Sequence, residues 1–140
     1  MNANWQLDRM GYQANLAAAT YYLPQPAGNL TAANRYYWDM QGFSDIGVSF
    51  YLVASDANNT LTLTFESSND ATAWVDISMA GYDLNQNAYG TASWVANNST
   101  MSRQVDFDNL LARYFSVKIV VALGGAANNS VSVYSQRTSI

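Results

Sequence analysis

The sequence predicts an all-β protein, a single antiparallel β-sandwich of about eight strands that is jelly-roll-like and has an extended N-terminal arm. Apolar residues recur at every second position rather than at helical spacing. Clusters of Asp, Asn and Gly separate these runs, as turns separate strands. The chain has 140 residues, 49% hydrophobic and 14% aromatic, enough for one domain with its own core. We expect residues 1–35 to form the arm and residues 36–140 the sandwich.

The clearest strands lie in the middle of the chain. From Ile46 to Ser55, apolar side chains share one face at Ile46, Val48, Phe50, Leu52 and Ala54. From Thr60 to Glu66, Leu61, Leu63 and Phe65 alternate with threonines and the glutamate. Such alternation is typical of a strand with one buried face. A polar turn, Asp56–Asn59, separates the two runs. The pattern predicts an antiparallel hairpin.

The last third of the chain repeats this pattern. Ser116–Leu123 alternates through Val117, Ile119, Val121 and Leu123, and Ser130–Arg137 places Val131 and Val133 inward. Gly124–Asn129 lies between them, so a second hairpin is expected. The remaining elements are four shorter strands and one helical turn, expected at Tyr36–Met40, Trp74–Met79, Ser93–Ala96, Met101–Phe107 and Asp108–Tyr114.

The first 35 residues combine proline with many apolar side chains. Both prolines, Pro24 and Pro26, lie here, and proline cannot donate a ladder hydrogen bond, which excludes this piece from a central strand. A disordered tail would be poor in large apolar residues. Two interpretations remain: the arm lies on its own sandwich as an edge strand, or it packs on a neighbouring subunit or host surface. The interface candidates are Trp5, Leu7, Tyr12, Tyr21, Tyr22, Leu23 and, beyond the arm, Tyr37.

Charge is sparse. Charged residues make up 11% of the chain and the net charge is −4. Lys118 is the single lysine, and the arginines are scattered. Nucleic acids and anionic membranes attract clustered cations, so neither is an expected partner. No apolar run approaches membrane-spanning length. A surface with little charge to desolvate suits contact with proteins or sugars.

The residue types do not favour catalysis. Cysteine and histidine are absent, which removes thiol chemistry and the usual general base at neutral pH. Asp56, Asp70 and Asp83 occur in turn sequences, where aspartate bonds nearby backbone amides. Asp106 and Asp108 alternate on one strand face, but the Asp-x-Asp-x-Asp-Gly calcium loop is missing. We therefore expect no enzymatic activity, no cofactor and no metal.

The aromatic residues allow two uses. They fill the core or subunit contacts, or they form exposed platforms on which sugar rings stack. A glycan-binding groove would be lined by at least two of five candidates, Tyr37, Trp74, Tyr82, Tyr89 and Trp94.

One stretch resembles β-sandwich modules of tailed-phage virion proteins. In Leu61–Asp76, a strand ends in Ser68-Asn69-Asp70 and is followed by Trp74-Val75-Asp76, while Gly42-Phe43 opens the strand before it. The resemblance covers about a third of the chain. Among these modules the chain is most similar to head decoration, or cement, proteins.

This resemblance implies that Trp74 re-enters the core at the start of a strand. It also implies a homotrimer on the outer surface of the capsid, where it binds the major capsid protein and stabilises the lattice. The alternative is a carbohydrate-binding β-sandwich module of a phage tail or baseplate.

Overall fold

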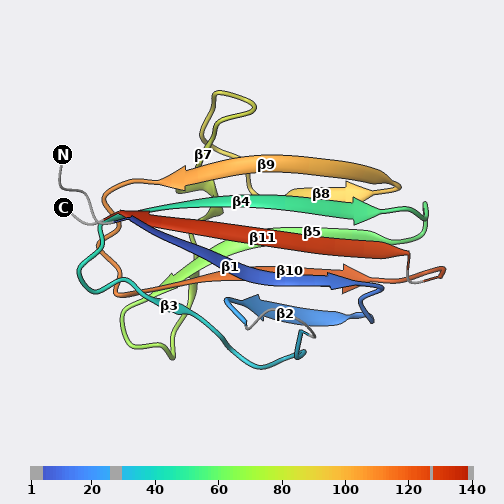
Figure 1. Cartoon of the computed structure of the whole chain (residues 1–140), viewed down its shortest axis with the longest axis horizontal. Coiled ribbons are helices and arrows are strands. Elements are labelled where there is room, and N and C mark those ends of the chain that lie inside the picture. The colour runs from blue at the N-terminus through green and yellow to red at the C-terminus, as the bar shows by residue number, and fades with distance from the viewer. Residues whose placement is uncertain (1–4, 26–29, 127, 139–140) are drawn as a thin grey trace.

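The computed structural model describes residues 5–25, 30–126 and 128–138. Within these residues the chain forms eleven strands and one short 3-10 helix, arranged as two antiparallel sheets packed face to face (Figure 1). The all-β sandwich is therefore confirmed. No helix in the described part of the chain is long and apolar enough to cross a membrane.

The front sheet in Figure 1 has five strands. Its order is β1 (Trp5–Ala14), β11 (Asn129–Thr138), β4 (Asp45–Ala54), β9 (Ser99–Phe107) and β7 (Tyr82–Asp83).

The second sheet has six strands. Its main path is β2 (Ala19–Leu23), β10 (Tyr114–Ala122), β5 (Thr60–Ser68) and β6 (Val75–Asp76), while β3 (Trp38–Asp39) pairs with β10 and β8 (Trp94–Asn97) pairs with β5. The 3-10 helix η1 (Ser78–Ala80) lies between β6 and β7.

The topology is that of a jelly roll. Among the described residues, eight strands are four or more residues long: β1, β2, β4, β5, β8, β9, β10 and β11. In the five-stranded sheet the long strands lie in the order β1-β11-β4-β9, which are the first, eighth, third and sixth of the eight along the chain. In the six-stranded sheet they lie in the order β2-β10-β5-β8, which are the second, seventh, fourth and fifth. Successive long strands therefore alternate between the sheets in most connections, as in double-sheet jelly rolls.

Both predicted hairpins are wrong, although their strands are present. β4 and β5 belong to different sheets, and so do β10 and β11. The apolar face of β4 packs across the core against that of β5, with the Phe50 and Phe65 ring centroids 6.3 Å apart. Alternation shows which face of a strand is buried. It does not show whether the next strand pairs with it in the same sheet or packs opposite it in the other sheet, because both arrangements bury the same face.

Two buried asparagines hold the loops that cross between the sheets. The Asn59 side chain accepts hydrogen bonds from the backbone N–H groups of Gly124 and Gly125, at 3.1 and 3.2 Å, and donates to the Ala126 carbonyl. Asn129 accepts from the Leu16 N–H at 2.7 Å and donates to the Leu16 carbonyl. The β4–β5, β10–β11 and β1–β2 connections are thus joined at one end of the sandwich.

The core lies between the sheets and is centred on aromatic rings. Phe65, fully buried, contacts the rings of Phe50, Trp94, Phe107 and Phe115, with centroid separations from 4.9 to 6.3 Å. The inward residues predicted on the four long runs are buried, except Leu123, which packs partly exposed against the core.

Several shorter predictions need correction. The strand expected at Trp74–Met79 is only Val75–Asp76, followed by the 3-10 helix. No helical turn forms at Asp108–Tyr114, where the chain is irregular before β10. Trp74 does not re-enter the core but remains partly exposed, with the Arg35 guanidinium 4.4 Å from its ring centroid. Trp94 fills the core instead.

The N-terminal segment lies on the sandwich of its own chain. β1 pairs with β11 from Trp5 to Ala14, with an irregularity between Arg9 and Gly11. β2 pairs with β10 from Ala19 to Leu23 and ends before Pro24. Both are edge strands, as the interpretation that the arm lies on its own sandwich predicted. The division into domains at residue 35 stays a prediction.

Candidate functional site

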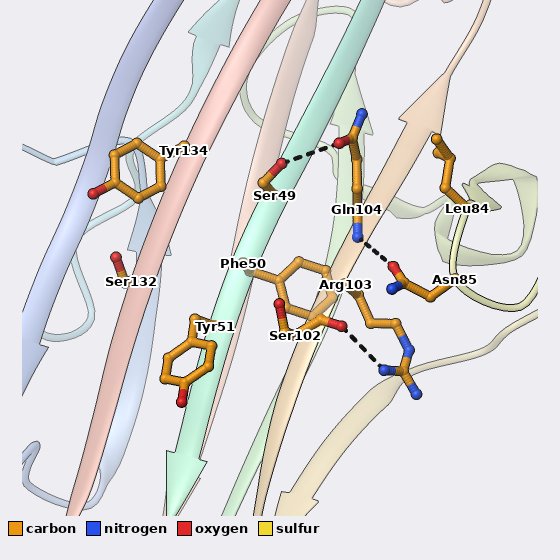
Figure 2. A pocket seen from close by; sticks show the side chains of 10 residues that line it. All are labelled: Ser49, Phe50, Tyr51, Leu84, Asn85, Ser102, Arg103, Gln104, Ser132 and Tyr134. Atoms are coloured by element: carbon orange, nitrogen blue, oxygen red, sulfur yellow. Dashed lines mark hydrogen bonds between the residues drawn. The ribbon is translucent and has the colours of Figure 1, made fainter.

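A pocket of about 500 Å³ opens on the outer face of the five-stranded sheet. Its floor comes from β4, β9 and β11, and one wall comes from Leu84 and Asn85, just after β7 (Figure 2). In Figure 1 the segment after β7 projects beyond the edge of this sheet.

Strand register places the floor residues in two rows. In one row Ser49 pairs with Tyr134 on β11 and with Gln104 on β9. In the next row Tyr51 pairs with Ser132 and Ser102. The two tyrosines are therefore diagonal neighbours, and their side chains are 47% and 40% exposed. The alternation that buries Phe50 and Val133 directs these hydroxyl and amide side chains outward.

A buried carboxylate anchors the wall. Asp83 is fully buried, and its Oδ1 accepts the N–H groups of Asn85 and Gln86 at 2.9 and 3.2 Å. Its Oδ2 accepts the Trp94 indole N–H at 2.9 Å and lies 3.5 Å from Arg103 Nε. A buried carboxylate needs such partners to offset its lost hydration. Asp83 thereby joins the loop to the core.

Gln104 connects the wall and the floor. Its backbone N–H donates to Asn85 Oδ1 at 3.1 Å, and its carbonyl accepts the Leu84 N–H at 3.0 Å. Its side-chain Oε1 accepts the Ser49 hydroxyl at 3.4 Å (Figure 2), and its Nε2 donates to Asp106 Oδ1 at 3.2 Å. These bonds hold the wall against the floor of the pocket.

Acidic residues lie next to the pocket on the same sheet face. Asp106 on β9 pairs with Gly47 on β4, and a Cβ atom added to Gly47 would be only 2.7 Å from Asp106 Oδ1. Burial is the largest cause that raises the pKa of Asp106, and the charges of Asp108 and Asp45 raise it further, against the bond from Gln104. The described residues contain no group of three or more metal-ligating side chains placed to hold an ion.

The predicted turn roles of three aspartates are confirmed. Asp56 Oδ1 accepts the Asn58 N–H at 2.8 Å. Asp70 Oδ1 accepts the N–H groups of Thr72 and Ala73, both at 2.9 Å, and these bonds are the main reason that its pKa is lowered. Asp83 has the same local bonds in addition to its contacts with the core.

The interface candidates divide into three groups. Tyr21 and Leu23 are buried in the core of the chain itself. Tyr22 is partly exposed, with Arg35 3.8 Å from its ring centroid, and Tyr37 is 39% exposed and contacts Trp74 and Tyr114. The side chains of Trp5, Leu7 and Tyr12 lie outside the description, although their backbones belong to β1.

Four of the five candidates for a glycan groove form two separate pairs, and the fifth is buried. Trp94 is buried in the core, so it cannot line an exposed groove. Tyr37 contacts Trp74, while Tyr82 contacts Tyr89 in the region after η1. The pocket is lined instead by Tyr51 and Tyr134, which the sequence reasoning missed. Their signal was the repeated Ser-x-Tyr at outward positions of two strands, Ser49-x-Tyr51 and Ser132-x-Tyr134.

No family model matches the chain, and no curated protein matches it in sequence. Among solved structures it is similar to the SPBc2 prophage-derived protein YomS, with a TM-score of 0.54 and 14% identity over 99% of this chain and 96% of YomS. It is also similar to the PBSX exported protein XepA, with a TM-score of 0.61 and 12% identity over 99% of this chain. The chain spans only 39% of XepA. At these identities the likeness shows the fold, and both neighbours are phage-derived proteins.

Proposed function

We propose that this chain is a non-enzymatic structural protein of a phage particle. In its specific form, the proposal is a decoration protein on the outer surface of the capsid, which binds the major capsid protein and stabilises the lattice as a homotrimer. The observation that carries the proposal is the fold shared with prophage-derived YomS over 99% of this chain and 96% of YomS. The proposed role requires neither nucleic acid nor a membrane.

The outer face of the six-stranded sheet supports docking on protein. One row across four strands consists of Thr20, Val120, Thr62 and Val95. Val120 and Val95 are 37% and 42% exposed. The neighbouring row contributes Tyr22, Lys118 and Thr64. Lys118 is the cation within these rows, and the Arg35 guanidinium beside Tyr22 is paired with Glu66, so little unpaired charge has to be desolvated on association. Three linked copies would add modest contacts through multivalency.

Removing the N-terminal segment would not isolate an interface. β1 pairs along nearly the whole of β11, and Tyr21 and Leu23 belong to the core. Truncation would therefore unfold an edge of the sandwich as well as remove a contact surface. A point substitution on the exposed face separates binding from folding.

Replacing Val120 with Glu tests this surface. The side chain is partly exposed, so the fold is retained, but the new carboxylate must be desolvated in any contact on this face. We expect decoration of purified, undecorated phage shells to fall at least tenfold, measured by co-sedimentation.

Leu111→Glu is the matched control, because Leu111 is 97% exposed in the irregular segment before β10. It should decorate shells like the parent chain, and the parent chain should have the mass of a trimer in solution. Equal decoration by the Val120 variant would remove this face from the mechanism. A parent chain that stays monomeric and never joins shells would contradict the proposed decoration role.

A further inference from the structure

We infer that the pocket between Tyr51 and Tyr134 is a binding site for a neutral oligosaccharide. Its volume of about 500 Å³ lies within the range of sites that bind small molecules. This site is on the five-stranded sheet, so it does not depend on the proposed docking of the six-stranded sheet.

Two exposed aromatic rings give the site its apolar contacts. Tyr51 on β4 and Tyr134 on β11 are diagonal across one strand pair, a separation of about 7–8 Å between Cα atoms. Figure 2 shows both rings on the same face of the sheet, with Ser132 between them. The C–H face of a sugar ring is apolar and packs on an aromatic ring, so one extended saccharide can contact both tyrosines.

The remaining groups match sugar hydroxyls. Ser49, Ser102 and Ser132 offer hydroxyls, while Gln104 and Asn85 offer amides. Hydroxyl and amide groups both donate and accept hydrogen bonds. They therefore suit a saccharide, which carries a hydroxyl group on most of its ring carbons. The bonds of Gln104 to Ser49 and Asp106 hold its amide in one orientation, which lowers the entropy cost of binding.

Charge selects a neutral ligand. Of the described residues that line the pocket, none has a carboxylate, and the one charged group, Arg103, is 3.5 Å from the buried Asp83. Beyond Gln104 the same face continues to Asp45, Asp106 and Asp108. These carboxylates and the net charge of −4 disfavour an anionic saccharide that extends along the sheet.

The test is a titration of the purified full-length chain with four neutral tetrasaccharides: cellotetraose, maltotetraose, mannotetraose and chitotetraose. Binding is followed by NMR chemical-shift changes and calorimetry, with tetragalacturonate as the anionic comparison. We expect saturable shifts centred on β4, β9 and β11 with at least one neutral probe, and weaker binding of tetragalacturonate. Tyr51→Ala and Tyr134→Ala should each weaken binding about tenfold, while Tyr51→Phe, which keeps the ring, should retain most of it.

Tyr37→Ala is the matched control, because Tyr37 is 39% exposed, close to the 40% of Tyr134, but does not line the pocket. It should bind like the parent chain. The inference is overturned if no neutral probe gives saturable shifts, if tetragalacturonate binds more tightly, or if the tyrosine variants bind normally. Unchanged thermal midpoints for the tyrosine variants will show that a loss of binding is not a loss of folding.

Discussion

At the scale of single residues, Asp83 shows how a polar group that loses water is matched by specific partners. Its carboxylate is fully buried, yet it accepts three hydrogen bonds and lies near one guanidinium. The sequence predicted only the two local bonds, because the turn context is visible in neighbouring residues. The contact with Trp94 joins residues of different sheets, which a local pattern does not show.

Asp106 provides a prediction about pH. Burial and the nearby Asp108 and Asp45 raise its pKa, so the folded chain favours the neutral acid more than the unfolded chain does. Stability from this group is therefore fully present below pH about 4, the ordinary pKa of Asp, and is lost as the pH rises through the raised pKa. Asp106→Asn removes this loss.

We expect Asp106→Asn to unfold at the same denaturant midpoint as the parent chain near pH 3 and at a higher one at pH 7. Urea titrations across this range measure the difference, and the pH 3 sample is the internal control. A variant that is less stable than the parent at pH 7 would show that the charged form of Asp106 stabilises the fold.

At the scale of elements, the sequence predicted strands well and pairing poorly. The inward faces of β4, β5, β10 and β11 follow from apolar alternation, and nearly all of those residues are buried. Their partners do not follow, because Asp56–Asn59 and Gly124–Asn129 are turn sequences that serve a hairpin or a crossing between sheets equally well. Loop-to-loop bonds such as those of Asn59 distinguish the two, and they join residues more than 60 positions apart.

The candidate pocket was missed for the same reason. Tyr51 and Tyr134 are 83 positions apart in the sequence, and they become neighbours because β4 pairs with β11. Aromatic residues that are adjacent in sequence, by contrast, are divided between the surface and the core, as Tyr37 and Trp38 are. A pocket on a sheet face can be predicted only after the strand order is known.

Asn59 allows a test of how the crossing loops are held. Asn59→Ala removes three hydrogen bonds between the β4–β5 and β10–β11 loops and takes from the Gly125 N–H the side-chain oxygen that it binds. We expect a loss of about 2–3 kcal/mol in the free energy of unfolding, measured by urea denaturation.

Asn58→Ala is the neighbouring control, because the Asn58 side chain is exposed. It should change the free energy of unfolding by less than about 0.5 kcal/mol. Equal effects at the two positions would mean that the loops are held by backbone contacts alone.

At the scale of the whole molecule, the chain is a rigid sandwich with two different outer faces. The six-stranded sheet presents threonine, valine, Tyr22 and one lysine, with the Arg35–Glu66 ion pair beside them. The five-stranded sheet presents a pocket of tyrosine, serine and amide groups. Most connections cross between the sheets, so each face is supported by strands from distant parts of the sequence. This arrangement suits a particle protein that docks through one face and leaves the other open.

The most direct test of the central claim is quantitative mass spectrometry of purified phage particles from the source that encodes this chain. The account predicts the chain in the particles at many copies, in a fixed ratio to the major capsid protein that persists through density-gradient purification. A chain that is expressed during particle production but absent from the purified particles would contradict it.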